Sequence, residues 1–378
     1  MSKNQVKTIL QVVPSLISGG VERGTVEIAK KIVDSGYKSI VISSGGPLVT
    51  HLETSGSKHI KLNVATKNPF LIWLNSRKIA EIIKDENVDI IHARSRAPAW
   101  SCLMAAKITG IKLITTFHGI YNFHNQFKKF YNSVMTRGDI VIAISNFVKD
   151  HIMKNYPVKD PSKVILIHRG VNHDEFNKER LTADILSKYR DIYNVPKNVA
   201  VILLPARMTE WKGQAILVKA LEKIKDLNFY CIMAGDLSKH PAYVKRIKSL
   251  ISKSKIQHRV QIFGNESNVI NLYGISDIVL STSTEPEAFG RTVIEAQSME
   301  KLVVASNIGG AAETIEDGST GFHVEPGNVD QLAEKIAHCL SIVNTDAAKT
   351  ITEAARKSVI EKFSLNLMLE KVMKVYRS

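Results

Sequence analysis

Short apolar runs alternate with amphipathic, helix-length segments through the N-terminal half of the chain. The apolar runs are rich in β-branched residues, which predicts buried strands. We expect strands at 8–14, 39–44, 60–62, 89–92, 112–117, 140–144 and 164–167, and helices at 22–35, 77–86 and 97–109. This alternation predicts a parallel sheet with helices on both faces, and such sheets bind ligands beyond the carboxyl ends of their strands.

A second series with the same alternation follows. Strands are expected at 199–205, 228–234, 260–263, 277–281 and 303–306, and helices at 214–225, 243–252, 330–342, 347–361 and about 365–376. Residues 177–198 are polar and poor in apolar positions, which indicates an interdomain linker. The sequence therefore predicts an α/β fold with two Rossmann-like domains, spanning residues 1–178 and 190–362.

Composition narrows the class of protein. At 378 residues and 44% hydrophobic content, the chain can bury the cores of two domains. No run of eighteen apolar residues predicts a membrane-spanning helix, and residues 1–11 lack the apolar region of a signal peptide. Cys102, Cys231 and Cys339 have neither disulfide nor metal-site spacing. We expect them to pack as small hydrophobes, as suits a reducing, cytoplasmic location.

Charge is unevenly distributed along the chain. The formal net charge is +15, and residues 1–178 carry 25 Lys and Arg against 13 Asp and Glu, which leaves +12 in the first half. This excess favours an anionic partner, which would be nucleic acid, an anionic membrane surface or an acidic acceptor. The alternative is a lysine-rich genome bias without a binding role.

Two carboxylates, Glu287 and Glu295, stand eight positions apart around a predicted strand–turn–helix junction. The strand is expected at 277–281 and the helix at 292–299. The start of a helix offers free N–H groups and a positive dipole end to an anion such as phosphate. Carboxylates would repel a phosphate, so we expect them to bind sugar hydroxyls beside it. Solvated acids on a surface turn are the alternative.

Two cations follow the strand predicted to end at Pro205. Arg207 and Lys212 lie five positions apart at the mouth of a parallel sheet. Arginine binds phosphate oxygens bidentately and lysine acts as a point charge, so the pair suits a diphosphate. The alternative is a solvated basic loop.

Other candidates follow strands of the first half. Gly19 and Gly20, after Ser18, precede a helix, although no G-x-G-x-x-G fingerprint is present and a tight turn is an equal alternative. Arg94 and Arg96 follow the strand at 89–92 and are candidates for an anionic acceptor group.

Aromatic and basic residues interleave in one segment and predict an interfacial helix at a membrane or lipid acceptor, with packing against the core as the alternative. A second apolar segment, 68–73, is expected to form a loop of the same kind. The interleaved residues are Tyr121, Phe123, Phe127, Phe130 and Tyr131 with Lys128, Lys129 and Arg137.

Taken in order, these motifs resemble those of retaining glycosyltransferases with the GT-B fold, family 4 (glycosyl transferases group 1). The match covers nearly the whole chain: the glutamate pair, the R-x4-K-G segment, a T-x-H-G segment at 116–119 and a glycine-rich turn at 309–313 expected to approach a ligand. Family members usually have Gly at the position of Ala288. This departure, with an extra acid at Glu285, leaves open which acid meets the sugar.

The resemblance implies a role for each matching residue. It implies that Glu287 binds the donor sugar, Glu295 the nucleotide ribose, and Arg207 and Lys212 the leaving diphosphate, without a metal or other cofactor. His118 would contact the sugar near the reacting carbon, Gly19 and Gly20 would line the donor, and Ser145 would lie on the acceptor side. Four further residues are expected at the donor: Phe289, Gly290, Arg291 and Thr292.

For the whole molecule the resemblance implies two sheets facing a central cleft, with a C-terminal helix at about 363–378 that returns to the first domain. The expected activity is transfer of a hexose from a nucleotide sugar, UDP-linked in preference to GDP- or ADP-linked. The expected acceptor is lipid-linked or a saccharide of cell-envelope glycan or lipopolysaccharide, met at the inner face of the cytoplasmic membrane. A nucleotide-sugar epimerase, which needs no acceptor, and a basic nucleic-acid-binding protein are the alternatives.

Overall fold

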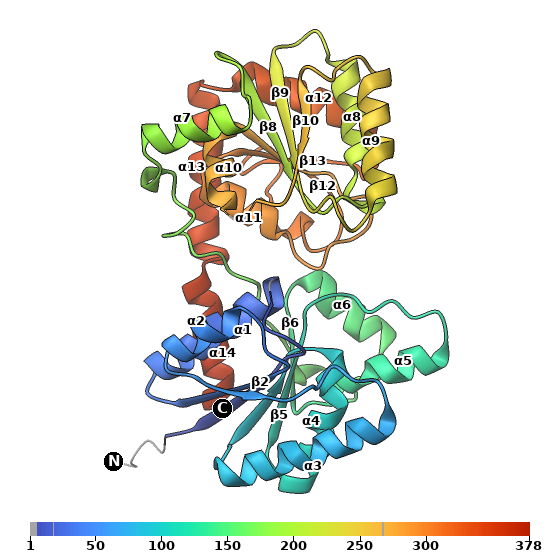
Figure 1. Cartoon of the computed structure of the whole chain (residues 1–378), viewed down its shortest axis with the longest axis vertical. Helices are drawn as coiled ribbons and strands as arrows, with labels where there is room; N and C mark the ends of the chain where they lie inside the picture. The colour runs from blue at the N-terminus through green and yellow to red at the C-terminus, as the bar shows by residue number, and fades with distance from the viewer. Residues whose placement is uncertain (1–5, 18, 267) are drawn as a thin grey trace. The chain divides into compact units, whose positions relative to one another are not determined.

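The computed structural model describes residues 6–17, 19–266 and 268–378. The chain forms two compact units. The first unit comprises Met1–His168 and Met368–Ser378, and the second comprises Arg169–Leu367. Each is an α/β unit built on one sheet (Figure 1). The predicted fold class is confirmed.

A sheet of seven described strands forms the centre of the first unit, in the order β3-β2-β1-β4-β5-β6-β7, and all neighbours are parallel. Leu10 in the central strand lies opposite Ile40 on one side and Ile91 on the other. Burial from both faces explains the continuous apolar runs of these strands. The strands are β1 (Thr8–Val12), β2 (Lys38–Ser43), β3 (Lys58–Lys61), β4 (Ile90–Ala93), β5 (Lys112–Phe117), β6 (Ile140–Ala143) and β7 (Val164–Leu166).

Helices connect consecutive strands of this sheet. Helix α1 packs with α2, and α3 packs along α4 (Figure 1). The helices are α1 (Gly20–Asp34), α2 (Leu48–Thr54), α3 (Pro69–Asp85), α4 (Arg96–Thr109), α5 (Gln126–Asn132) and α6 (Asn146–Asn155), with 3-10 turns η1 (Ser133–Thr136) and η2 (Pro161–Lys163).

Helix α3 begins earlier than the predicted range of 77–86. The side chain of Asn68 caps it by accepting hydrogen bonds from the N–H groups of Phe70 (2.9 Å) and Leu71 (3.3 Å). Pro69 occupies the first helical position, where its missing N–H costs nothing. The prediction of an apolar loop at 68–73 was therefore wrong, because these residues form the first turn of the helix.

The last part of α14 (Leu365–Arg377) belongs to the first unit. Tyr376 is fully buried, and its hydroxyl lies 2.6 Å from Nδ1 of His92. Nε2 of the same imidazole lies 2.7 Å from the Thr116 hydroxyl. Burial, and secondarily the charge of Arg94, holds the pKa of His92 well below its usual value, so the ring stays neutral at pH 7.

Six described strands make the sheet of the second unit, in the order β10-β9-β8-β11-β12-β13, and every neighbouring pair is again parallel. The strands are β8 (Ala200–Pro205), β9 (Phe229–Ala234), β10 (Val260–Phe263), β11 (Ile278–Ser281), β12 (Leu302–Ser306) and β13 (Phe322–Val324).

Helices pack on this second sheet as well. Leu217 of α8, Ile247 of α9 and Ile336 of α12 share one core cluster with Ile202 and Leu280 of the strands. Helix α7 packs with α10, and α11 packs with α13. The helices are α7 (Ala183–Ile192), α8 (Gln214–Lys223), α9 (Pro241–Lys253), α10 (Val269–Ile275), α11 (Arg291–Ser298), α12 (Val329–Ile342) and α13 (Asp346–Lys362), with 3-10 turns η3 (Lys178–Arg180), η4 (Glu210–Lys212) and η5 (Ala312–Thr314).

Residues 177–198 were predicted to be an interdomain linker. In the structure they carry η3 and α7 and belong to the second unit. The Thr182 hydroxyl oxygen caps α7 by accepting the N–H of Ile185 at 3.3 Å. A surface helix needs only one apolar face, so a low apolar density did not exclude a helix here.

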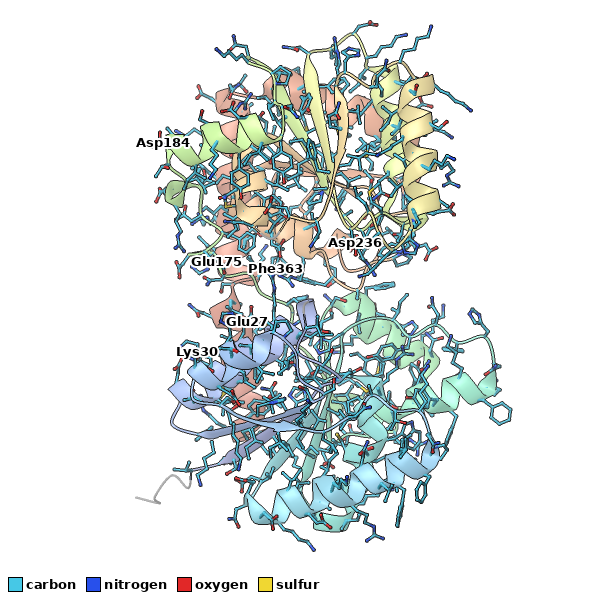
Figure 2. All side chains as sticks on the ribbon, in the orientation of Figure 1. Glu27, Lys30, Glu175, Asp184, Asp236 and Phe363 are labelled. Atoms are coloured by element: carbon cyan, nitrogen blue, oxygen red, sulfur yellow. The ribbon has the colours of Figure 1, made fainter. Side chains whose placement is uncertain are left out.

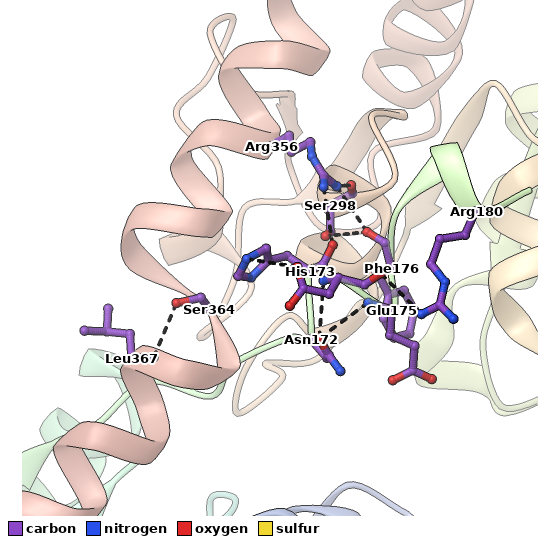
Figure 3. Close-up of polar contacts among 10 residues, drawn as sticks. Asn172, His173, Glu175, Phe176, Arg180, Ser298, Arg356, Ser364 and Leu367 are labelled. Carbon is purple, nitrogen blue, oxygen red and sulfur yellow. Dashed lines mark hydrogen bonds and ion pairs between the residues drawn. The ribbon is translucent and has the colours of Figure 1, made fainter.

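The segment that precedes α7 also belongs to the second unit, so the first unit ends at His168 and not at residue 178. Arg356 of α13 donates from Nη1 to the Phe176 carbonyl (3.2 Å) and from Nη2 to the His173 carbonyl (3.3 Å). The Ser298 hydroxyl donates to the same Phe176 carbonyl at 2.8 Å (Figure 3). These bonds attach the segment to α11 and α13.

Candidate active site

The sheet of the second unit reverses its strand order between β8 and β11. Strand β9 lies on the outer side of β8, and β12 lies on the outer side of β11. The loops that follow Pro205 and Ser281 therefore leave the same carboxyl edge in opposite directions. Open α/β sheets bind ligands in the crevice at such a reversal.

The structure brings Lys212 of the first loop and Glu287 of the second loop together at this edge. Nζ of Lys212 lies 2.7 Å from Oε1 of Glu287, and the two side chains are 13% and 17% exposed. The hydroxyls of Ser283 and Ser281 donate to the same carboxylate oxygen, the latter at 3.4 Å. A cation, a carboxylate and two hydroxyls thus share a half-buried site.

The ammonium of Lys212 is partly withdrawn from water, and this burial lowers its pKa. The neighbouring charge and hydrogen bond of Glu287 oppose that shift, whereas the charge of Arg207 adds to it. Glu287 therefore helps to keep Lys212 protonated. A phosphate ligand would do the same, because it also brings negative charge to the ammonium.

Trp211, which was not among the predicted site residues, contacts both cations. Cζ of Arg207 is 5.4 Å, and Nζ of Lys212 is 4.3 Å, from the centroid of its ring. Such cation–π contacts hold both positive groups on one aromatic surface. The available signal was an aromatic residue directly before Lys212, within the basic segment.

Backbone contacts join the two loops directly. The Thr284 N–H donates to the Trp211 carbonyl at 2.7 Å, and the Thr282 hydroxyl donates to the Lys212 carbonyl at 2.9 Å. Gly213 has φ +75°, and a Cβ at this position would lie 2.0 Å from the Thr282 carbonyl oxygen. The glycine after Lys212 thus permits the close approach that places Lys212 beside Glu287.

Glu285 differs from Glu287 in its surroundings. Its side chain is exposed, and among the described residues it has no hydrogen-bond or ion-pair partner. Glu287 is the acid that lies in the cluster with Lys212.

Glu295 lies inside α11 and is 8% exposed. It accepts hydrogen bonds from the Tyr273 hydroxyl at Oε2 (3.0 Å) and from Arg291 Nη2 at Oε1 (2.7 Å). Burial, and then the charge of Glu295, raises the pKa of Tyr273 well above its usual value, so the phenol remains a donor. Thr292 lies in the first turn of α11, and its side chain opposes a small part of this pKa shift. A carboxylate has further lone pairs, so Glu295 retains capacity to accept a ligand hydroxyl.

Phe289 and Gly290 pack against other residues of the second unit. Phe289 is 6% exposed and meets the ring of Phe363 edge-on at 5.9 Å. Gly290 caps α11, and a Cβ there would lie 2.9 Å from Cα of Ala311. Both residues support the turn that carries Glu287.

Gly309 and Gly310 lie close to the backbone of the turn that carries Glu287. Gly309, at φ +66°, pairs with Glu287 in an isolated parallel bridge. The Gly310 N–H donates to the Glu287 carbonyl at 2.7 Å, and a Cβ on Gly310 would lie 2.3 Å from the Ala288 oxygen. These contacts hold the Glu287 turn in place, and the approach of a ligand to the same glycine-rich turn stays a prediction.

In the first unit, two predicted site regions lie beyond carboxyl ends of strands. His118 directly follows β5. Gly19, at φ +130°, precedes α1, and Gly20 is its first residue. Ser18 lies outside the described residues. The strand order reverses between β1 and β4, so Gly19 and Gly20 flank the reversal point of this sheet.

Ser145 and Arg94 have roles within the protein that the sequence did not suggest: one caps a helix, and the other is buried. The Ser145 oxygen caps α6 by accepting the Val148 N–H at 3.0 Å. Arg94 is 2% exposed, and its charge interacts with Tyr376 and with Glu27. Glu27 lies on α1 and is labelled in Figure 2. The expectation that Arg94 meets an acceptor anion at the surface is corrected, because its guanidinium is buried inside the first unit.

Arg96, by contrast, lies at a partly open position. Its Nη1 donates to Asn132 Oδ1 at 2.8 Å, and its guanidinium carbon lies 4.1 Å from the centroid of the Tyr121 ring. The remaining N–H groups of the guanidinium are available to a ligand.

Neither a metal-binding cluster nor a membrane-spanning helix is present among the described residues. No group of three or more His, Cys, Asp or Glu side chains within residues 6–17, 19–266 and 268–378 is placed to hold a metal ion. Over the same ranges, no helix has the length and apolar character needed to cross a bilayer.

Comparison with known proteins agrees with this architecture. Residues 187–358 match the family model Glycosyl transferases group 1, and residues 18–175 match Glycosyltransferase Family 4. A crystal structure of a glycosyltransferase from Rickettsia africae ESF-5 is 56% identical with TM-score 0.92, covering 99% of this chain and 98% of that one. Anabaena Alr3699/HepE in complex with UDP and glucose is 26% identical with TM-score 0.84, covering 98% and 99%.

A curated relative extends the likeness over the whole chain. The N-acetyl-alpha-D-glucosaminyl L-malate synthase of Bacillus anthracis is 24% identical over 379 residues, which cover 96% of this chain and 94% of the relative. Two α/β units on parallel sheets, matched along their whole length by such structures, define a GT-B enzyme. The chain belongs to the group 1, or family 4, glycosyltransferases.

Proposed function

We propose that this glycosyltransferase is a retaining enzyme that moves a hexose from a UDP-sugar to a lipid-linked or saccharide acceptor. The observation that carries the proposal is the cluster of Lys212 and Glu287 at the strand reversal of the second unit. It combines a cation for a diphosphate with a carboxylate for sugar hydroxyls.

The chemistry follows from charge. As the glycosidic bond breaks, negative charge grows on the leaving diphosphate and positive charge on the sugar ring. Arg207 and Lys212 stabilise the diphosphate, and no resident metal is part of this proposal. Glu287 accepts hydrogen bonds from the sugar and orients it, Glu295 accepts a ribose hydroxyl, and His118 contacts the sugar near the reacting carbon.

The uridine nucleotide is supported by a relative. Alr3699/HepE, similar over nearly the whole of this chain, forms complexes with UDP and glucose and with UDP-glucose. The two donor-side segments, around Arg207 and around Glu287, both fall in the region that matches the group 1 family model.

Charge and exposed aromatic side chains in the N-terminal half of the chain support an anionic acceptor. Residues 1–178 carry the +12 excess of charge, and Phe127 and Phe130 of α5 are 88% and 59% exposed. Exposed aromatics beside lysines suit an anionic membrane surface. We therefore place the acceptor in envelope glycan or lipopolysaccharide synthesis, at the cytoplasmic face of the membrane.

The test begins with thermal stabilisation of the purified protein by UDP, GDP and ADP. We expect UDP to raise the melting temperature most. UDP-sugar hydrolysis follows, and NMR of the transfer product reports whether the anomeric configuration is retained. No stabilisation by any nucleotide would overturn the proposal, and full turnover of the donor to its epimer without acceptor would identify an epimerase instead.

A further inference from the structure

A pocket of ≈ 540 Å³ opens in the first unit between the segment before α3, the amino end of α4, and α5. We call it the basic pocket. Three of its lining residues are cations, and none is an acid. It is lined by Lys67, Ser95, Arg96, Ala97, Lys128, Tyr131 and Asn132.

The positive charge of the basic pocket is not balanced by the protein. Among the described residues, Lys67, Arg96 and Lys128 form no ion pair. Other lysines of the same unit do form ion pairs. Nζ of Lys31, for example, lies 2.6 Å from Oε1 of Glu370. Three uncompensated cations around one cavity attract an anion of more than one negative charge.

The guanidinium of Arg96 is fixed in position by contacts with two neighbouring residues. Asn132 accepts from Nη1 at 2.8 Å, while Asn132 Nδ2 donates to the Tyr121 carbonyl at 3.3 Å. With the ring of Tyr121 beneath it, the guanidinium has lost much of its side-chain freedom before any ligand arrives. A pre-positioned guanidinium binds two oxygens of one phosphate at a lower entropic cost.

Neutral donors complete the wall. The Tyr131 hydroxyl is buried and has no hydrogen-bond partner within the described part of the chain. Ser95 stands at the N-cap of the 14-residue helix α4, where its side chain makes no capping bond. The positive end of α4 therefore faces the pocket with a hydroxyl beside it, an arrangement that favours phosphate.

Exposed aromatic side chains accompany the pocket. Phe70 is 64% exposed in the first turn of α3, which follows Lys67 in the chain. Phe127 and Phe130, 88% and 59% exposed, flank Lys128 in α5. Apolar rings beside a cationic pocket match an amphiphile that carries phosphate on an acyl or prenyl chain.

We propose that the basic pocket binds the phosphate group of a membrane lipid, and that this lipid carries or is the acceptor. The inference rests on the proposed function, because it specifies the lipid-linked acceptor. Arg96 binds the phosphate bidentately, Lys67 and Lys128 neutralise its charge, and the aromatic rings contact the lipid chain. A phosphomonoester or terminal diphosphate, with two negative charges, suits this site better than a phosphodiester.

The test measures binding of the whole protein to phosphatidylcholine vesicles doped with phosphatidic acid, a phosphomonoester, or with phosphatidylserine at equal surface charge. We expect at least about tenfold tighter binding to the phosphatidic acid vesicles. The double variant K67Q/K128Q should lose about thirtyfold on them, since each cation at a surface contributes about fivefold. R96K keeps the positive charge but lacks the planar guanidinium that binds two phosphate oxygens. This variant should lose the preference for vesicles with the phosphomonoester.

The matched control is K78Q/K84Q. Lys78 and Lys84 lie on α3, are exposed, and form no ion pair among the described residues. This variant has the same net charge as K67Q/K128Q but leaves the pocket intact. An equal loss in both variants, or equal binding to the two kinds of vesicle, would overturn the proposal in favour of general charge attraction. Melting temperatures confirm that each variant folds.

Two further outcomes separate the pocket from its alternatives. If K67Q/K128Q abolishes calorimetric binding of inorganic phosphate while vesicle binding is unchanged, the ligand is a soluble phosphate and the lipid assignment fails. If the vesicle results agree with the expectation but no nucleotide stabilises the protein, phosphate binding by the basic pocket is supported. The proposal of a nucleotide-sugar donor is then rejected. UDP affinity of the pocket variants should equal that of the unchanged protein.

Discussion

Nζ of Lys212 lies 2.7 Å from Oε1 of Glu287, so the cation proposed for the diphosphate is already paired with the acid proposed for the sugar. In the proposed complex with a nucleotide sugar, the ammonium is shared between carboxylate and phosphate. We therefore expect the two residues to affect nucleotide affinity in opposite directions, and both to contribute to transfer.

Replacement of Lys212 by Met should weaken UDP binding by about 10- to 150-fold, because a hydrogen bond to a charged group contributes about 1.5 to 3 kcal/mol. Glu287 would also lose its counter-charge and repel the diphosphate. Isothermal titration calorimetry measures the change. The control is K239M, which removes a 71% exposed lysine from the same unit; an equal loss in K239M would refute a specific role for Lys212.

Replacement of Glu287 by Gln should leave UDP binding unchanged or slightly tighter, since a negative charge beside the diphosphate is removed. Sugar transfer should fall by about 10- to 100-fold, because the sugar loses a charged hydrogen-bond acceptor. Calorimetry and turnover with the UDP-sugar separate the two effects. E285Q, at the exposed neighbouring acid, should keep its activity, and the opposite ranking would assign the sugar to Glu285.

The pH dependence of UDP binding should report on Lys212. Burial lowers the pKa of this lysine, and Glu287 partly restores it. The charged form binds the diphosphate, so affinity falls as pH rises through the pKa. Above pH 8 the terminal phosphate, with a second pKa of about 6, is about 99% ionised and contributes almost no further change.

The E287Q variant lacks the carboxylate that raises the pKa of Lys212. Its loss of UDP affinity should therefore occur at lower pH than in the unchanged protein. Dissociation constants measured between pH 7 and 10 give both curves. Superimposed curves, or a shift to higher pH in E287Q, would contradict the coupling of the two side chains.

Substitution of Gly310 by Ala should destabilise the second unit by about 1 to 3 kcal/mol, because the new methyl group would overlap the Ala288 carbonyl. The turn that carries Glu287 would shift, so transfer should fall as well. Thermal unfolding and turnover are the measurements. The matched control is G264A, where a Cβ meets nothing within 4 Å and the backbone is unstrained. Equal stability of the two variants would show that the close contact of Gly310 with the Ala288 carbonyl does not stabilise the unit.

Replacement of Tyr376 by Phe should destabilise the first unit by about 1 to 3 kcal/mol, because Nδ1 of the buried His92 loses its partner. Denaturant unfolding measures the difference in free energy. Y37F is the control, since the Tyr37 hydroxyl has no hydrogen-bond partner among the described residues. A smaller effect of Y376F than of Y37F would show that the His92 contact does not stabilise the unit.

Much of the fold was predictable because strands buried on both faces of a parallel sheet appear in the sequence as short apolar runs. The strand expected at 112–117 is β5, bounded by polar and glycine positions that mark its ends. Helix limits were harder. Asn68 and Pro69 are a helix-start signal, but the apolar residues after them were interpreted as a loop.

The candidate site was predictable as a set of residues and not as a geometry. Which strands are neighbours depends on contacts between distant segments, so the contact of Lys212 with Glu287 could not be read from their spacing. Trp211 and Tyr273 were missed because aromatic residues usually indicate a core. Arg94 was misjudged, since burial of a guanidinium depends on Glu27 and Tyr376, which are remote in sequence.

The contact between His92 and Tyr376 joins residues that are 284 positions apart. A ribosome adds about 5 to 20 residues per second, so roughly 15 to 60 seconds separate the synthesis of the two side chains. During that interval the nascent first unit lacks the aromatic side chain that contacts His92 and Arg94 in the complete structure. The second unit ends at Leu367, nine residues before Tyr376, so both units become complete only when almost the whole chain has been made.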